Sequence, residues 1–358
     1  MVQTLDFHMH PVFYGEAGVG QLGNFLDFHT RPDTSIFILT DENTRRHCLP
    51  VLLEKWPEGS SARILEIPAG EATKSLQTCE PLWQSLTTAY ANRYSIMINL
   101  GGGVVCDLGG FTASVYKRGF RFIHCPTSLM AMCDAAIGGK TGVDLGPLKN
   151  MIGTFTQPMA VFIDPDFLET LPEREIHNGF AEMLKHGLIA EASYFDELVK
   201  NGPDEITPEQ IRISVEIKSD IVIRDPLEKN YRKALNFGHT IGHALESHSL
   251  ENDASPLLHG EAIILGMLCE TIISEKMQIL PEAAAGHIIS ALEQYIPDYA
   301  FTENTLDAVE SLMLHDKKNR GQTPTFTLLK QTGVAITDQH APEEIVREAL
   351  EETATMAG

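Results

Sequence analysis

The chain has 358 residues, and at roughly 150 residues per domain this length predicts two domains. Its 27 Lys and Arg against 49 Asp and Glu give a formal net charge of −22, which argues against a nucleic-acid binder because such proteins carry a basic surface stripe. Hydrophobic residues make up 43% and charged residues 21%, which is typical of a globular protein. No uncharged apolar run approaches the ~18 residues that a membrane-spanning helix needs.

The six cysteines show no C-x-x-C spacing. The first residues carry neither the basic region nor the apolar region of a secretory signal. We therefore expect reduced, mostly buried thiols in a cytoplasmic protein, with no disulfide and no cysteine metal ligand.

The first half of the sequence alternates short β-branched runs with helical spacing. This alternation predicts βαβ units and a mainly parallel sheet. The expected strands are Ser35–Thr40, Arg63–Ile67, Ser95–Leu100, Phe122–Cys125 and Ala160–Ile163. The expected helices are Glu42–Trp56 and Lys74–Ala91.

The second half carries long helical patterns, several of which open on Pro-Glu, a pair that suits the first turn of a helix. We expect an α/β domain over residues 1–173 and a mainly α-helical domain over residues 174–358, with ligands bound beyond the strand ends in the cleft between them. One strand pair is expected among the helices, at Thr325–Lys330 and Gly333–Ile336. The expected helices are Arg174–Ile189, Pro208–Asp225, Tyr231–Ser247, Gly260–Met277, Pro281–Tyr295, Leu306–Leu314 and Pro342–Thr355.

A glycine-rich loop, Gly101–Gly110, follows the third expected strand. Glycines at a strand end let backbone N–H groups approach a phosphate, and the next helix N-terminus adds positive dipole. The run is not G-x-G-x-x-G, so a tight turn without a ligand is the alternative. Residues 41–43 follow the first expected strand, where carboxylates commonly contact ribose hydroxyls, and residues 70–74 follow the second. For each of these loops, the alternative is a helix N-cap.

Residues 126–150 form a second glycine-rich tract, which contains Asp134, Lys140, Lys149 and Asn150. Lysines beside glycines, in a stretch too apolar for a solvated loop, favour anion binding. The alternative is a surface loop with ordinary exposed lysines.

Arg232, Asn236, His239 and His243 are spaced i, i+4, i+7 and i+11. On one α-helix all four would form a single stripe, which is too polar for a core. Their spacing therefore predicts a functional face.

Three residues from separate helices could hold a divalent metal with positions left open for substrate. Glu182 shares a helix face with Lys185, His239 lies on the polar stripe, and His259 opens another helical run. Spacing alone does not decide between His239 and His243 as the ligand.

These features together resemble the 3-dehydroquinate synthases of the sugar-phosphate cyclase family, over nearly the whole chain. The matching stretches are GEATK (70–74), GGGVVCD (101–107), KRGFRFIHCPTSLMAMCDAAIGGKTG (117–142), KNMIG (149–153), FLETLP (167–172), FAEMLKHG (180–187), RKALNFGHTIGHALE (232–246), LHGEA (258–262) and HDKKN (315–319).

The resemblance implies a Rossmann-like NAD-binding domain followed by a helical domain that binds one zinc or cobalt ion, in a homodimer. It implies Glu182, His239 and His259 as metal ligands, with His243 on the substrate side. The implied NAD contacts are Asp41, Asn43, Glu71, Lys74, Gly102, Gly103, Val104, Asp107, Thr127, Ser128, Lys140, Lys149, Thr170 and Leu171. The implied catalytic and substrate contacts are Arg118, Asp134, Lys140, Asn150, Lys185, Lys218, Arg232, Asn236, His243, and either Lys317 or Lys318. The family's dimer arrangement suggests that Arg118 reaches the site of a neighbouring subunit.

The implied enzyme is a phosphorus–oxygen lyase of the shikimate pathway. It would convert 3-deoxy-D-arabino-heptulosonate 7-phosphate to 3-dehydroquinate and phosphate, with NAD taking a hydride from C5 and returning it before an intramolecular aldol closes the ring. The alternatives are another sugar-phosphate cyclase, an NAD- and metal-dependent polyol dehydrogenase and a non-catalytic metal-binding module. The many cationic residues favour 3-dehydroquinate synthesis over these alternatives, because they suit a substrate that bears both a phosphate and a carboxylate.

Overall fold

The structure, a computed structural model, describes residues 3–6, 10–15, 18–146, 148–314 and 324–358. It separates into two compact units, Met1–Ile176 and His177–Gly358. The first unit is α/β and the second is mainly helical, so the expected fold class is confirmed. The predicted division into an NAD-binding domain that ends at residue 173 and a metal- and substrate-binding domain that begins at residue 174 stays a prediction.

The first unit is built on a seven-stranded sheet with the order β1-β2-β9-β6-β5-β3-β4. All pairings are parallel except that of β1 with β2. The strands are β1 (Gln3–Asp6), β2 (Pro11–Tyr14), β3 (Ile36–Asp41), β4 (Arg63–Ile67), β5 (Ile96–Gly101), β6 (Arg121–Pro126) and β9 (Val161–Ile163).

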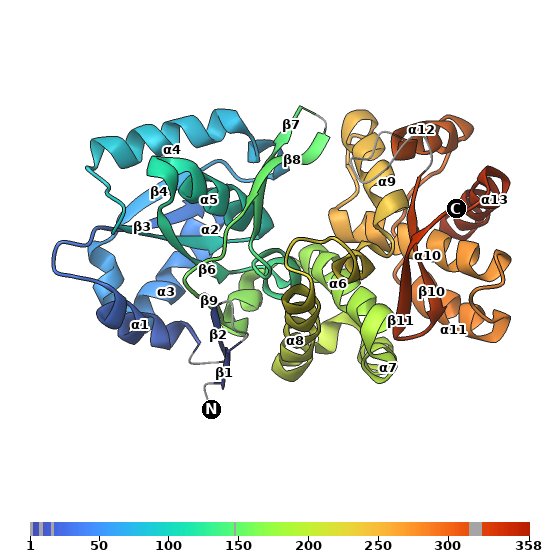
Figure 1. Ribbon diagram of the computed structural model, residues 1–358, viewed down its shortest axis with the longest axis horizontal. Helices are drawn as coiled ribbons and strands as arrows, with labels where there is room; N and C mark the ends of the chain where they lie inside the picture. The colour runs from blue at the N-terminus through green and yellow to red at the C-terminus, as the bar shows by residue number, and fades with distance from the viewer. Residues whose placement is uncertain (1–2, 7–9, 16–17, 147, 315–323) are drawn as a thin grey trace. The chain divides into compact units, whose positions relative to one another are not determined.

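Helices cover both faces of this sheet, with α4 and α5 on one side and α1 and α3 on the other (Figure 1). The chain leaves β3 toward β4 but leaves β5 toward β6, in the opposite direction, so the strand order reverses between β3 and β5. Such a switch point opens a crevice at the carboxyl ends of the strands, where open α/β sheets bind ligands. The helices are α1 (Leu22–His29), α2 (Glu42–His47), α3 (Leu49–Lys55), α4 (Leu76–Thr88) and α5 (Gly103–Val115).

One expectation for this unit needs correction. The helix expected over residues 42–56 is divided into α2 and α3 at Cys48. Pro50, in the first turn of α3, has no N–H to continue the hydrogen bonding of α2. The tract 126–150 contains a π-helical turn at Ala131–Ala135 and runs into the antiparallel hairpin of β7 (Lys140–Leu145) and β8 (Leu148–Phe155), and its anion binding stays a prediction.

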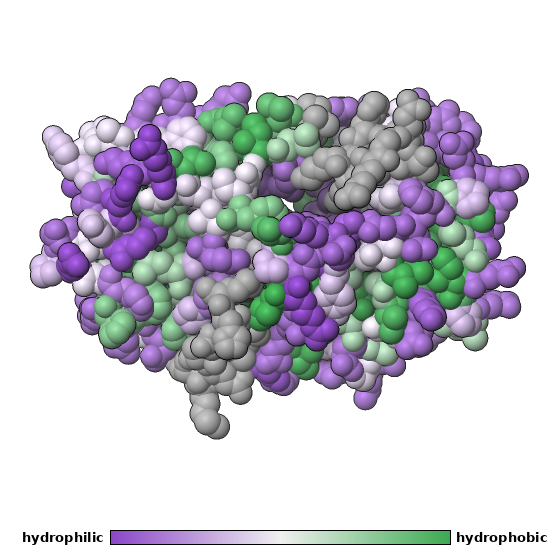
Figure 2. Space-filling view, in the orientation of Figure 1, coloured by the Kyte–Doolittle hydropathy of each residue, from purple (hydrophilic) through white to green (hydrophobic). Residues whose placement is uncertain are grey.

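The β7–β8 hairpin exposes large apolar side chains. Leu145 is 52% exposed, Met151 43% and Phe155 55%. Figure 2 shows hydrophobic residues gathered over this part of the visible face. The hairpin is therefore an apolar projection, although the tract reads as glycine-rich in sequence.

The second unit is a set of helices around α10 (His259–Lys276), most of whose side chains are buried. A helix that is apolar on all sides belongs in the middle of a core, and α10 packs against α9, α11, α13 and β10. Within the described residues, no helix is long and apolar enough to cross a membrane. The other elements are α6 (Glu173–Ala190), which begins in the first unit, α7 (Ala192–Asn201), α8 (Pro208–Arg224), α9 (His239–Asn252), α11 (Glu282–Glu293), α12 (Glu303–Leu314), β10 (Phe326–Gln331), β11 (Val334–Gln339) and α13 (Glu343–Ala357).

The single helix expected at Tyr231–Ser247 is wrong. A 3-10 helix, Tyr231–Asn236, ends before Gly238, and α9 begins at His239. Gly238 has φ +78°, a left-handed conformation that breaks the helix and that glycine adopts without steric cost. The predicted four-residue stripe is therefore divided, and only its two histidines share α9.

Candidate active site

The loop after β5 places the amino end of α5 at the sheet edge. Gly102 is the residue before α5, and no side chain caps the helix there. A Cβ at Gly101 would lie 2.5 Å from the Val105 side chain, so the chain can turn this tightly only with glycine. The Thr127 N–H donates to Gly101 O at 3.0 Å and joins the end of β6 to the loop. These features suit the close approach of a phosphate to backbone N–H groups.

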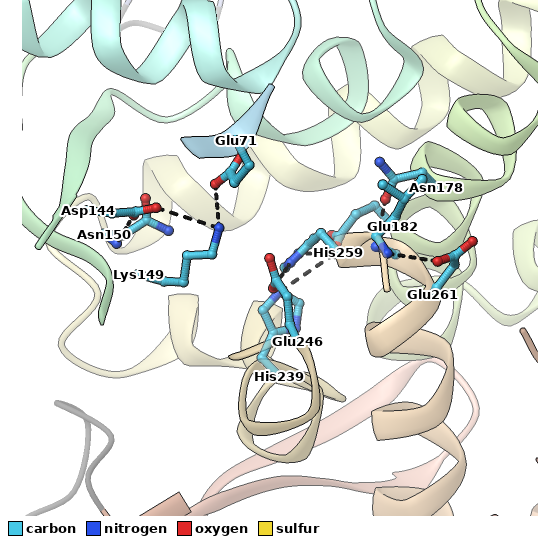
Figure 3. A network of polar contacts seen from close by, with 12 residues as sticks. Glu71, Asp144, Lys149, Asn150, Asn178, Glu182, His239, Glu246, His259 and Glu261 are labelled. Atoms are coloured by element: carbon cyan, nitrogen blue, oxygen red, sulfur yellow. Dashed lines mark hydrogen bonds and ion pairs between the residues drawn. The ribbon is translucent and has the colours of Figure 1, made fainter. Parts of the chain in front are cut away.

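Two charged residues that follow β4, Glu71 and Lys74, form ion pairs with other residues that the family resemblance assigns to NAD binding. Lys74 Nζ lies 2.6 Å from Asp107 Oδ2. Figure 3 shows the second group, in which Lys149 Nζ lies 2.6 Å from Glu71 Oε1 and 3.5 Å from Asp144 Oδ2. Burial alone would lower the pKa of Lys74, but the charges of Asp107 and Glu71 raise it above its usual value. Lys74 is therefore a fixed, buried cation.

Asp41, at the end of β3, is the N-cap of α2. Its Oδ1 accepts a hydrogen bond from the Thr44 N–H at 2.7 Å, and Thr44 Oγ1 accepts from the Asp41 N–H at 3.0 Å. The sequence left open whether Asp41 caps a helix or contacts a ribose. The structure establishes the capping role, and the ribose contact stays a prediction.

The other predicted contacts in the first unit lie on its loops and on the β7–β8 hairpin. Asn43 is on α2, Ser128 follows β6, and Thr170 and Leu171 lie at the end of a 3-10 helix, Pro165–Thr170. Arg118 and Lys140 are exposed, and Asn150, with φ +52°, donates its N–H to Asp144 Oδ1 at 2.6 Å. Asp134 lies in the π-helical turn.

In the second unit, the three predicted metal ligands meet around one carboxylate oxygen. Glu182 lies on α6 and is fully buried, and its Oε2 accepts a hydrogen bond from Lys185 Nζ one turn later. Its other oxygen, Oε1, is 3.6 Å from Nε2 of His239 and 3.6 Å from Nε2 of His259. Two ligand atoms on a tetrahedral zinc ion are about 3.4 Å apart, given bonds of about 2.1 Å. The separations therefore fit a shared metal ion.

His243 lies beside the same group, one turn after His239 on α9. The ring centroids of these two histidines are 5.1 Å apart, and those of His243 and His259 are 5.6 Å apart. The nitrogen atoms of His239, His243 and His259 lie within 4.8 Å of one another. The geometry thus offers a three-histidine set as well as the predicted set with Glu182.

The two predicted ligand histidines present Nε2 to Glu182 because Nδ1 is engaged elsewhere (Figure 3). His259 Nδ1 lies 2.9 Å from Glu246 Oε2, and His239 Nδ1 lies 3.1 Å from Phe237 O. Contacts of this kind fix the tautomer of a metal-binding histidine. Burial alone would lower the pKa of His259, but Glu246 and Glu182 raise it to about 10, which marks a place where positive charge is stabilised.

The remaining polar residues predicted for the second unit lie on α8 and on the 3-10 helix before α9. Lys218 is 5% exposed, and Arg232 is 1% exposed with its Nη1 donating to Pro226 O at 3.0 Å. Asn236 Nδ2 donates to Glu228 Oε1 at 3.0 Å. Lys317 and Lys318 lie outside the described residues.

Sequence reasoning missed the acidic residues that support this cluster. Glu246 follows His243 by three residues on α9 and is the partner of His259. Its spacing from the two histidines of α9 could have predicted its place on the same face. Glu228, the partner of Asn236, could not have been predicted in this way, because it lies in a loop without helical or strand periodicity.

The chain matches known protein families over most of its length. Residues 64–178 match the model described as 3-dehydroquinate synthase N-terminal, and residues 179–319 match 3-dehydroquinate synthase C-terminal. A 3-dehydroquinate synthase of Parabacteroides distasonis is 41% identical over 320 residues, which cover 88% of this chain and 90% of the relative. One of Streptococcus sanguinis is 34% identical, covering 96% of this chain and 97% of the relative.

Solved structures share the fold. A 2-deoxy-scyllo-inosose synthase, complexed with carbaglucose-6-phosphate, NAD+ and Co2+, superposes with a TM-score of 0.84 at 24% identity, covering 98% of this chain and 100% of that one. The 2-epi-5-epi-valiolone synthase of Streptomyces hygroscopicus, with NAD+ and Zn2+ bound, gives 0.80 at 26% identity, covering 90% and 91%. An iron-containing alcohol dehydrogenase of Thermococcus thioreducens gives 0.69 at 14%, covering 97% and 98%. The chain therefore belongs to the 3-dehydroquinate synthase family and is an enzyme of that type.

Proposed function

We propose that this enzyme converts 3-deoxy-D-arabino-heptulosonate 7-phosphate to 3-dehydroquinate and inorganic phosphate. The reaction oxidises C5 transiently, releases phosphate by β-elimination, restores C5 and closes the ring by an intramolecular aldol. The observation that carries the proposal is the convergence of Glu182 with His239 and His259, at separations that suit a catalytic metal ion, in a chain of this family.

We assign residues 174–358 to metal and substrate binding, with Glu182, His239 and His259 as the ligands. A carboxylate and two imidazoles leave a zinc or cobalt ion with open positions for substrate oxygens. The buried Lys185 balances the charge of Glu182. His243 then stands beside the ligands as a group that can hold or move a proton.

We assign residues 1–173 to NAD binding, with pyrophosphate at the start of α5 and the charged pairs of Lys74 and Lys149 around the rest of the cofactor. When bound, NAD supplies a hydride acceptor that also returns the hydride, and the metal ion supplies a Lewis acid for the oxygen on the carbon being oxidised. The glycines at 101–103 support this assignment because they leave backbone N–H groups accessible at the helix start.

The cationic residues would hold the substrate. Lys185, Lys218 and Arg232 are all nearly buried, where attraction between a cation and an anionic group is stronger than it is in water. A phosphate and a carboxylate are the groups that such charges bind, and Arg232 can contact either one with two parallel hydrogen bonds. Positioned cations of this kind lower the barrier without reorganising during the reaction.

Asp41 gives a test of cofactor choice. A carboxylate beside the adenosine ribose repels a 2′-phosphate, so we expect at least a roughly ten-fold preference for NAD over NADP, equivalent to about 1.4 kcal/mol. Asp41→Asn should narrow this preference, because asparagine caps α2 as well as aspartate does while removing the charge. Steady-state activity with each cofactor measures the ratio, and an unchanged ratio in the variant would remove Asp41 from the ribose site.

The proposed function is tested by following phosphate release and absorbance at 340 nm in one reaction. With substrate in large excess over NAD, phosphate should accumulate far beyond the NAD supplied, with no lasting NADH signal, because the hydride returns to C5. A polyol dehydrogenase would instead release one NADH per turnover and no phosphate. The second outcome would overturn the proposal.

We also propose a homodimer in the cytoplasm. The exposed apolar side chains of the β7–β8 hairpin offer a surface that association could cover. All six cysteines are buried, which supports thiols that stay reduced in the cytoplasm. Light scattering on the purified protein tests the dimer, and a monomeric mass would contradict it.

A further inference from the structure

A buried carboxylate holds the backbone on both sides of His239. It belongs to Glu270 on α10, a residue with no exposed surface. The Gly238 N–H donates to Glu270 Oε2 at 2.7 Å, and the Thr240 N–H donates to Glu270 Oε1 at 3.2 Å. The Thr240 amide belongs to the peptide unit that directly follows His239, and the Gly238 amide lies one peptide unit before it, so the carboxylate holds the main chain on both sides of this histidine.

The start of α9 needs such a partner. The first amides of a helix have no acceptor within the helix, and its dipole favours a negative charge there. The residue before α9 is Gly238, which has no side chain to serve as a cap. Glu270 supplies the acceptor from another helix, and a carboxylate that accepts two N–H bonds is better compensated for burial than an isolated one.

Glycines bring α9 and α10 close enough for these hydrogen bonds. A Cβ at Gly266 would lie 1.9 Å from Gly238 O, and a Cβ at Gly242 would lie 3.0 Å from Ala262 O. The two helices therefore meet backbone to backbone, and neither can slide along the other without losing this fit.

Helix α10 connects both predicted ligand histidines. His259 is its first residue, and Glu270 follows eleven residues later, roughly 16 Å along the axis at 1.5 Å per residue. At its start, the Gly260 N–H donates to Asn178 Oδ1 at 2.6 Å, which joins α10 to α6, the helix of Glu182. One rigid helix thus supplies one ligand and fixes the main chain of another.

We propose that Glu270 is a positioning residue that holds His239 in place for metal binding, without touching the metal or the substrate. This inference rests on the proposed metal site. Partners that hydrogen-bond a metal-binding side chain directly are typically worth about 10- to 100-fold in metal affinity, and we take this range for Glu270, which acts through the main chain of His239. Glu270→Gln keeps the size of the side chain, but its NH₂ group must face one of the two backbone N–H donors. We therefore expect Glu270→Gln to weaken Co2+ binding by about that factor.

The experiment titrates the metal-free, full-length protein with Co2+ and records the visible spectrum of the bound ion. The matched control is Ser274→Ala, one turn later on the same helix. Ser274 Oγ is buried, accepts the Leu329 N–H at 3.1 Å and donates to the main-chain oxygen of Glu270 at 2.6 Å. Its removal therefore destabilises the unit at the same turn of α10 but leaves the Glu270 carboxylate and its two hydrogen bonds beside His239 in place. Thermal unfolding of each metal-free variant shows whether Glu270→Gln and the control lose similar stability.

The inference is supported if Glu270→Gln loses affinity and shifts the Co2+ spectrum while Ser274→Ala, at a similar loss of stability, does neither. It is overturned if both variants lose affinity alike, which reduces Glu270 to a structural cap, or if Glu270→Gln binds as the wild type does. Should Glu270→Gln fail to fold, Glu270→Asp, which shortens the reach but keeps the charge, is tested against the same criteria. His239→Ala distinguishes a failure of the Glu270 inference from a failure of the proposed metal site, because wild-type metal affinity in that variant would reject the metal site itself.

Discussion

His239→Ala should release the metal ion and reduce kcat/KM at least about 1000-fold. His239 Nε2 lies 3.6 Å from the Glu182 oxygen that also faces His259, so the substitution removes one of three predicted ligands. A Lewis acid contributes several kcal/mol to stabilising developing charge, and each ~1.4 kcal/mol is a factor of ten in rate. Metal content by atomic absorption and initial rates at saturating NAD measure both effects.

His243→Ala is the matched control, because His243 lies on the same helix face one turn later. If Glu182, His239 and His259 are the ligands, this variant keeps its metal and loses rate. If the three histidines are the ligands, both variants lose the metal and Glu182→Gln retains it. Stoichiometric metal at wild-type affinity in His239→Ala would contradict both sets.

Much of the fold was predictable because its signals are periodic. The strand expected at Arg63–Ile67 is β4 with the same bounds, and the helix expected at Pro208–Asp225 is α8 to within one residue. Both have a strong local pattern, and α8 also has a Thr207 capping box at its start. Elements with a consistent local pattern need no tertiary information.

The broken helix before His239 was not predictable from periodicity. The apolar and polar residues keep a helical spacing across Gly238, and a single interior glycine is often tolerated in a helix. The break follows from tertiary contacts, since a Cβ at Gly238 would lie 2.6 Å from Met267 Cγ and a buried carboxylate from α10 receives its N–H. A pattern within one segment carries no information about the helix packed against it.

The candidate site, like the fold, could be predicted from the sequence only in part. Glu182, His239 and His259 come from three helices far apart in sequence, and residue types already grouped them as possible ligands, whereas the resemblance to a family was needed to choose His239 over His243. Residue types predicted that a metal could bind, but not which of His239 and His243 faces Glu182. The supporting residues Glu246 and Glu270 were missed because their role depends on contacts across helices, from Glu246 to the His259 side chain and from Glu270 to the backbone beside His239.

Gly266→Ala should be the most destabilising of the small substitutions in the second unit. A Cβ there would lie 1.9 Å from Gly238 O and 2.8 Å from Gly242 N, and both contacts are backbone atoms that no rotamer change can move. Overpacking a core costs about 1–3 kcal/mol, and a clash with backbone belongs at the upper end. At about 2–4 °C per kcal/mol for a unit of this size, we expect thermal unfolding to begin about 6–12 °C lower.

Gly286→Ala should instead stabilise the protein. Comparing the two variants separates the effect of the backbone clash from the effect of replacing glycine with alanine. Gly286 lies inside α11, and its added Cβ would meet no atom within 4 Å. Alanine there loses less conformational entropy on folding, so we expect about 0.4–1 kcal/mol of stabilisation. Calorimetry on both variants checks the pair. If Gly266→Ala unfolds at the wild-type temperature, α9 and α10 are farther apart than the structure places them, and the support that α10 gives to His239 fails with that contact.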